Sequence, residues 1–163
     1  MRFWVGALGI VGLGCGWGCQ SAAAPRDYTA MSARFFLEAA NADGTPLVLP
    51  LSGTHLSVNP KPVITEGDIV NVELVQVDLG QCLLVQLTPS ATRDFYRLSV
   101  AHQGRRLVLM VNDKAIGARR LDGAITNGVV YVFVELPESD LPALVNNLKQ
   151  SSVAMQRELA RKG

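Results

Sequence analysis

Residues 82–118 read CLLVQLTPSATRDFYRLSVAHQGRRLVLMVNDKAIGA, and this stretch decides the fold. An apolar run at 82–87 has the length and composition of a buried strand, and a polar segment with helical spacing follows it. Two more apolar runs come after the helix, at 106–111 and 114–118, with only two residues between them. A helix flanked closely by strands must bury its apolar face against their sheet, so this part of the chain predicts a mixed α and β fold.

The helix in this stretch has start and stop signals at both ends. Thr88 can accept hydrogen bonds from the free amides of the first turn, and Pro89 fits the first helical position. Gly104 suits the left-handed conformation in which helices commonly end. An apolar stripe at helical spacing consists of Ala91, Phe95, Leu98 and Ala101 or His102. We therefore predict an amphipathic helix that begins after Thr88 and ends before Gly104.

Two hairpins are predicted, one on each side of this helix. Asn112 and Asp113 tolerate positive φ, so they suit a tight turn between the strands at 106–111 and 114–118. On the other side, residues 69–77 alternate in polarity, and Gly80-Gln81 turns that strand back into 82–87.

The outer parts of the chain add further elements. Residues 33–39, 47–51 and 54–58 have strand-like composition, and the prolines in NPKP at 59–62 exclude a helix there. Residues 129–134 are almost wholly apolar and predict a central strand. A last helix begins at Ser139-Asp140, with a stripe formed by Leu141, Leu144, Val145 and Leu148. Residues 151–163 are polar and basic, and we expect a tail that is helical if it has regular structure, and frayed.

The order of these elements predicts an α+β fold. We expect a mostly antiparallel sheet with two helices on one face, close to the ferredoxin-like plan. The predicted domain spans residues 31–150, since the chain is long enough for one core but not for two.

The first residues have the layout of a bacterial export signal. Arg2 precedes an uncharged apolar run that is too short to span a bilayer, and small residues and cysteine follow. We predict a lipoprotein signal at 1–18, lipidation of Cys19 and a flexible tether at 19–30. Lipidation of Cys15, ordinary cleavage within 21–24, or an uncleaved hydrophobic end are the alternatives. The expected location is the outer side of a membrane, with the outer membrane favoured because Gln20, rather than aspartate, follows Cys19.

Composition narrows the range of partners and chemistry. The chain has 15 basic and 14 acidic residues, which gives no reason to expect a nucleic-acid partner. With Cys19 acylated, Cys82 is the one thiol left for the domain, so a disulfide framework is excluded and a buried, inert thiol is expected. Neither His55 nor His102 belongs to a cluster with metal-ligand spacing, and Glu66 with Asp68 fits a capped turn better than an acid–base pair. We therefore expect no metal, no cofactor and no enzymatic activity.

Three segments together resemble the head of the first periplasmic domain of SecD, a subunit of the bacterial protein-export translocase. They are residues 87–95 (LTPSATRDF), 104–118 (GRRLVLMVNDKAIGA) and 125–128 (ITNG), and the resemblance extends over residues 69–148. It implies the SecD head fold and a role in contacting protein in the cell envelope. SecD also has transmembrane helices with charged residues for proton coupling, for which this sequence shows no counterpart, so energy-coupled pulling of exported chains is not implied.

A cluster of cations marks the hairpin at 106–118. It consists of Arg105, Arg106, Lys114, Arg119 and Arg120, against Asp113 alone. These charges either protect a sheet edge from aggregation or form a docking patch for anionic lipid or an acidic protein. Leu74, Met110 and Tyr131 offer a second surface, an open apolar groove, unless strands from residues 33–58 cover it.

The sequence thus favours a non-enzymatic, lipid-anchored envelope protein that binds another protein, either a secretion client or envelope machinery. The alternative is a structural lipoprotein that docks on anionic membrane or cell wall through the basic hairpin.

Overall fold

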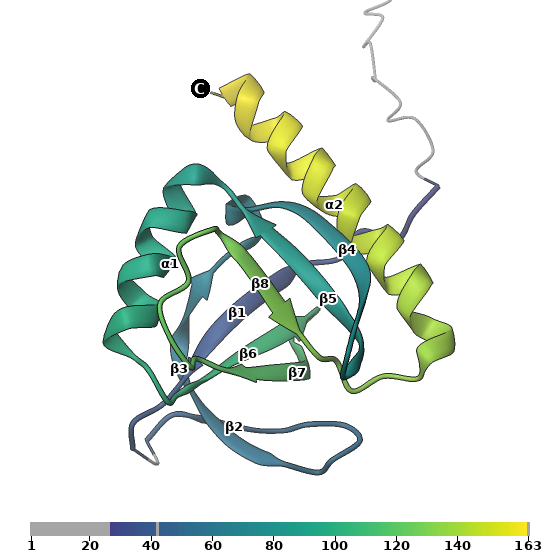
Figure 1. Cartoon of the computed structure of the whole chain (residues 1–163). Helices are drawn as coiled ribbons and strands as arrows, with labels where there is room; N and C mark the ends of the chain where they lie inside the picture. The colour runs from purple at the N-terminus through teal and green to yellow at the C-terminus, as the bar shows by residue number, and fades with distance from the viewer. Residues whose placement is uncertain (1–26, 42, 163) are drawn as a thin grey trace, which may run out of the picture.

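The computed structural model describes residues 27–41 and 43–162 (Figure 1). The expected signal at 1–18, both candidate lipidation sites (Cys15 and Cys19) and most of the expected tether lie outside the described residues. Within the described part of the chain, no helix combines the length and the hydropathy needed to cross a bilayer.

Eight strands and two α-helices make up the described fold. In chain order they are β1 (Ala33–Glu38), β2 (Thr45–Val48), β3 (His55–Ile64), the short 3-10 helix η1 (Glu66–Asp68), β4 (Ile69–Val77), β5 (Gly80–Leu87), α1 (Pro89–Ala101), β6 (Arg106–Val111), β7 (Lys114–Arg120), β8 (Val129–Val132), the 3-10 helix η2 (Glu138–Asp140) and α2 (Leu141–Lys162). All strand pairings are antiparallel among the described residues, so the predicted α+β class with mostly antiparallel strands is confirmed.

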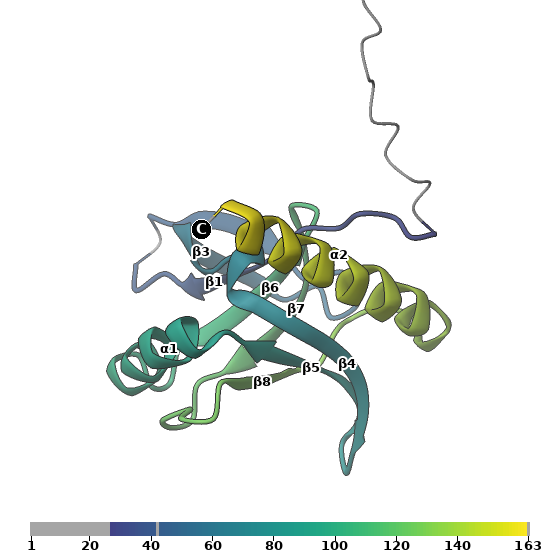
Figure 2. The same cartoon turned by 90° about the horizontal axis from the view of Figure 1, so that it is seen from above.

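The strands form two sheets, where the sequence had suggested one ferredoxin-like sheet. One sheet has the order β2-β3-β1-β6-β7, and the other has the order β4-β5-β8. The sheets face each other, with α1 at one side and α2 at the other, rather than both helices on one face (Figures 1 and 2). The difference arises because β1 inserts between β3 and β6, and this long-range pairing leaves the β4–β5 hairpin to pair with β8.

The main core lies between the two sheets and the two helices. Its fully buried side chains include Phe35, Leu83, Leu107, Leu109, Val130 and Val132, and the helices contribute Ala91, Phe95, Leu144 and Leu148. A second, smaller core lies on the other face of the five-stranded sheet and contains Leu49, Leu56, Val58 and Val108. Strand β6 is buried on both faces because the β2–β3 hairpin folds back over it, which explains its continuous apolar sequence.

Helix α1 begins as the sequence predicted. The Thr88 hydroxyl accepts a hydrogen bond from the Ala91 N–H at 3.2 Å, and Pro89 is the first helical residue. After the helix, Gly104 has a φ of 85°, a left-handed conformation that favours glycine.

Helix α2 is longer than the sequence suggested. It continues through residues 151–162, where we had expected a frayed tail. Ser152 is buried, and the Gln156 side-chain amide donates to the carbonyls of Gly67 at 2.9 Å and Ile69 at 3.0 Å. These contacts with η1 and β4 hold the last turns against the fold.

The residues before β1 are also held. The Thr29 N–H donates to the Asn147 side chain at 3.1 Å, and the Met31 N–H donates to the Ser151 hydroxyl at 2.9 Å. The end of the expected tether nearest the domain therefore lies alongside helix α2 and is hydrogen-bonded to it.

Candidate functional site

The β6–β7 hairpin brings together some of the predicted cations and separates others. Arg106 and Arg120 lie directly opposite each other. The turn alone would pair Arg106 with Arg119, but a register shift between Leu109 and Met110 makes Arg120 the partner. Asn112 and Asp113 form that turn with φ values of 46° and 63°. Lys114 pairs with Val111 at the other end of the hairpin, so it does not belong to the same cluster.

Carboxylates partly neutralise the arginine pair. Glu38 accepts a hydrogen bond from the Arg106 N–H at 2.9 Å, and its other oxygen lies 3.4 Å from the Arg106 guanidinium. Arg120 forms an ion pair with Asp122 at 3.5 Å. Because like charges directly opposite each other in a sheet repel, these two acids make the Arg106–Arg120 pairing tolerable and weaken the local positive field.

Arg119 belongs to the opposite face of the same strand. It lies opposite Leu107, whose side chain is in the main core, and its guanidinium donates to the Tyr131 carbonyl at 3.2 Å. Arg119 thus reaches from β7 to β8, where it lies at the border between the two sheets. Arg105 is half-buried just before β6, and its carbonyl accepts from the Leu121 N–H at 2.9 Å.

The outer face of the three-stranded sheet carries an aromatic pair. Tyr131 on β8 and Phe133, which directly follows this strand, are 39% and 40% exposed, and the alternation of an extended chain puts both on the same face. Leu84 on β5 lies directly opposite Tyr131 and is half-buried. Neither helix and no strand of the other sheet covers this face (Figures 1 and 2). We call the surface formed by Leu84, Tyr131 and Phe133 the aromatic face.

The groove expected from Leu74, Met110 and Tyr131 does not form. Leu74 packs against the main core, and Met110 packs against the second core on the far side of the five-stranded sheet. The prediction was also wrong in making β8 a central strand, because it is the edge of its sheet. Phe133 was missed for this reason, because residues 129–134 (VVYVFV) are all apolar and lack the alternation in polarity that marks a half-exposed strand.

Cys82 is fully buried and unpaired, as predicted. Burial raises the pKa of its thiol, and the positive charge of Arg119 partly opposes this rise. The thiol is therefore protonated at neutral pH, and an inert packing role fits it better than nucleophilic chemistry.

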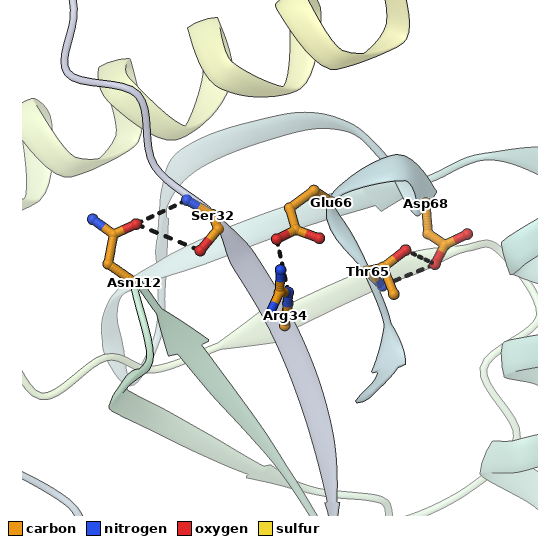
Figure 3. A network of polar contacts seen from close by, with 6 residues as sticks. All are labelled: Ser32, Arg34, Thr65, Glu66, Asp68 and Asn112. Carbon is orange, nitrogen blue, oxygen red and sulfur yellow. Dashed lines mark hydrogen bonds and ion pairs between the residues drawn. The ribbon is translucent and has the colours of Figure 1, made fainter. Parts of the chain in front are cut away.

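The polar residues near α2 serve the fold (Figure 3). The Arg34 guanidinium donates to the Glu66 carboxylate at 2.7 Å, and Asp68 accepts from both the N–H and the hydroxyl of Thr65 at 2.8 Å. The predicted capped turn at Glu66 and Asp68 is thus confirmed. Asn112 accepts from the Ser32 N–H at 2.9 Å.

A groove of about 380 Å³ lies beside this network, between residues 28–33 and α2. Three of the polar side chains that line it are engaged with other parts of the chain: Glu66 with Arg34, Asn112 with Ser32, and Ser151 with the Met31 N–H. The groove is a packing seam rather than a converging set of free polar groups. In residues 27–41 and 43–162, no group of three or more His, Cys, Asp or Glu side chains has the arrangement of a metal site. His55 begins β3 and His102 follows α1, so they belong to separate elements.

Comparison with known proteins shows a likeness of fold. No family model matches the chain, and no curated protein matches it. Among solved structures, a SecDF structure described as a membrane component that enhances protein export aligns with a TM-score of 0.58 and 18% identity, over 76% of this chain and 64% of that one. SecDF in a super-membrane-facing form aligns with a TM-score of 0.52 and 18% identity, over 78% of this chain and 18% of that one.

SecDF from Thermus thermophilus, a translocon-associated membrane protein, aligns with a TM-score of 0.52 and 15% identity, over 77% of this chain and 20% of that one. The chain therefore spans less than two thirds of each of these structures. The SecD-like fold that the sequence predicted is confirmed.

Proposed function

We propose that this chain is a non-enzymatic domain of the cell envelope that binds other protein, either a polypeptide in transit or part of the envelope machinery. The observation that carries this proposal is the uncovered aromatic face, where Tyr131 on β8 and Phe133 just after it are each about two-fifths exposed. Exposed aromatic side chains that gather on one face are typical of surfaces that bind other proteins.

The likeness in fold to SecDF supports an envelope location and an export-related role. The sequence adds the anchor, since Cys19, or Cys15, follows an apolar segment with the layout of a lipoprotein signal. An acyl anchor would hold the aromatic face close to a membrane across which other chains emerge. Mass spectrometry of the mature N-terminus tests this part: a diacylglyceryl group on Cys19 is expected, and an unprocessed chain without an acyl group would contradict it.

A binding assay tests the aromatic face itself. The probe is a fluorescent polypeptide kept unfolded by reduction and alkylation of its cysteines, and the measurement is its anisotropy on titration with the full chain. We expect Phe133→Ser and Tyr131→Ser each to weaken binding at least tenfold. Tyr96→Ser is the matched control, because Tyr96 is 44% exposed but lies on α1. Equal losses in all three variants, or in none, would contradict the proposal.

Docking of the basic hairpin on anionic membrane or cell wall is the competing function. The acids beside Arg106 and Arg120 weaken the field that such docking needs. Vesicles with anionic lipid give the decisive comparison. The docking function would be favoured if the chain without its anchor binds these vesicles in a salt-sensitive way. The Arg106→Gln, Arg120→Gln double variant would then lose this binding, and Phe133→Ser would keep it.

A further inference from the structure

Arg119 has unused hydrogen-bonding capacity beside the aromatic face. A guanidinium has five N–H donors. In the described part of the chain, the Tyr131 carbonyl, at 3.2 Å, is the single acceptor of a hydrogen bond from the Arg119 side chain. That bond fixes the guanidinium against β8, next to the backbone of one of the two exposed aromatic residues.

Arg119 also differs from its two neighbours in charge compensation. Arg106 has Glu38 and Arg120 has Asp122, whereas Arg119 forms no ion pair with a described residue. It is half-buried, so its charge is less well screened by water than the charge of an exposed arginine. A half-buried cation without a carboxylate is the kind of group that gains most from a charged ligand.

Arg119 and the aromatic face meet at Tyr131, whose carbonyl accepts the hydrogen bond from Arg119 and whose side chain belongs to the face. Cys82 lies on β5 at the alternation position of Leu84, which belongs to the aromatic face. Arg119 is the one charged group whose field lowers the pKa of this thiol against the effect of burial. The hydrogen bond to the Tyr131 carbonyl therefore places the positive charge at the edge of the aromatic face, beside β8.

We propose that Arg119 makes this surface selective for polypeptide segments that carry a carboxylate. This inference rests on the proposed function and adds a specificity to it. The occupant is an extended segment in which two apolar side chains, two residues apart, pack on Tyr131 and Phe133. Side chains two residues apart in an extended chain are about 6.6 Å apart, which is the spacing expected for Tyr131 and Phe133 at the end of β8 and just after it. An Asp or Glu beside them accepts the free N–H donors of Arg119, ideally as a two-pronged pair.

Three fluorescent peptides test the selectivity with the full chain. Each has eight residues with alternating apolar and serine positions, and they differ only in carrying one Glu, one Gln or one Lys at the same place. We expect the Glu peptide to bind at least fivefold more tightly than the Gln peptide, and the Lys peptide to bind most weakly. Arg119→Gln should remove the preference, and Arg119→Glu should reverse it toward the Lys peptide. Arg120→Gln is the matched control and should keep the preference, because Arg120 is already paired with Asp122.

The outcomes separate this inference from the function on which it rests. Equal binding of the three peptides, still dependent on Phe133, would overturn the selectivity and leave the binding function intact. Absence of any Phe133-dependent binding would overturn both. If the chain forms a dimer that dissociates in Phe133→Ser, the occupant is a second copy and the inference is overturned. Arg119-dependent binding to anionic vesicles, without selectivity among the peptides, would also overturn it. Arg119→Lys keeps the charge but not the two-pronged geometry, so it should retain only part of the preference, and it serves if Arg119→Gln does not fold.

Discussion

Gly117 of β7 lies directly against the backbone of Phe133, and this contact is where the two sheets meet. A Cβ added to Gly117 would overlap the Phe133 carbonyl oxygen and lie 3.1 Å from the Cα of Val134. An antiparallel bridge joins Gly117 to Val134, and the Glu135 N–H donates to the Ile116 carbonyl at 2.6 Å. Because Gly117 has no side chain, the backbone that follows β8 can run directly against β7.

Replacing Gly117 should therefore separate the sheets locally. We expect Gly117→Ala to cost about 1–3 kcal/mol in the free energy of unfolding, as an overpacked site that backbone atoms crowd from one side. Chemical denaturation followed by circular dichroism measures this. Gly123→Ala is the control, since a Cβ there would meet no atom within 4 Å, and its effect should stay within about 0.5 kcal/mol. Similar costs at both positions would show that the contact at Gly117 is not tight.

Glu135 predicts a pH-dependent stability. Its carboxylate accepts hydrogen bonds from the N–H groups of Leu51 at 3.0 Å and Ser52 at 2.8 Å, which ties the β2–β3 turn to the segment after β8. Burial opposes the charge, but the hydrogen bonds from Ser52 and Leu51 outweigh it, and the pKa of Glu135 is lowered. A lowered folded-state pKa stabilises the fold above the unfolded value of about 4.3 and loses this contribution as the pH falls through the folded value.

Glu135→Gln should accordingly lower the melting temperature at pH 7 by about 3 °C, for a loss of about 1 kcal/mol. The difference from the original chain should shrink below pH 4 and vanish once Glu135 is protonated. Melting curves between pH 2.5 and 7 check this, with Glu138→Gln, an exposed glutamate three residues later, as the control. A pH-independent difference would mean that the carboxylate charge does not hold the turn.

Glu38 should contribute to stability because its charge compensates one of two cations that face each other. Glu38→Gln removes the charge that compensates Arg106, so Arg106 and Arg120 repel across the hairpin. We expect a cost of about 1 kcal/mol at low salt, partly restored by Arg120→Gln in the same chain, and a smaller cost in 1 M salt. Asp94→Asn breaks the fully surface-exposed Asp94–Arg97 pair and should have almost no effect. A cost that does not depend on salt would point to the lost hydrogen bonds rather than to repulsion.

The last turns of α2 should contribute to stability. Gln156→Ala removes two hydrogen bonds to the carbonyls of Gly67 and Ile69, and we expect a cost of about 1–2 kcal/mol. Gln150→Ala, at an exposed position of the same helix, is the matched control. A chain that ends at residue 150 should lose more than the Gln156 variant, because it also loses the buried Ser152. Equal melting temperatures for the shortened and the full chain would support the predicted domain boundary at residue 150.

The elements with local signals were predictable from the sequence. Thr88 and Pro89 marked the start of α1, Asn112 and Asp113 marked a hairpin turn, and both were found where expected. Counting from that turn pairs Arg106 with Arg119, whereas a register shift between Leu109 and Met110 makes Arg120 its partner, and this shift was not predicted.

The features that depend on distant partners were not predictable in the same way. No local pattern says that β1 pairs with both β3 and β6, and so none says that there are two sheets. The polarity of Gln156 also does not show that it forms hydrogen bonds with η1 and β4, because a polar residue on a helix is normally expected to face solvent. The aromatic face was missed for the same reason: an apolar strand is central or peripheral depending on what lies beside it.

The position of β1 has a consequence for how the domain assembles. Strand β1, the first strand in the described part of the chain, becomes an inner strand of its sheet, and its neighbour β6 follows about 70 residues later along the sequence. Until then, the phenylalanine-rich strand has an unsatisfied edge and is vulnerable to aggregation. Final assembly must await the later half of the chain, and such non-local pairing makes slow, late-closing folding the expectation.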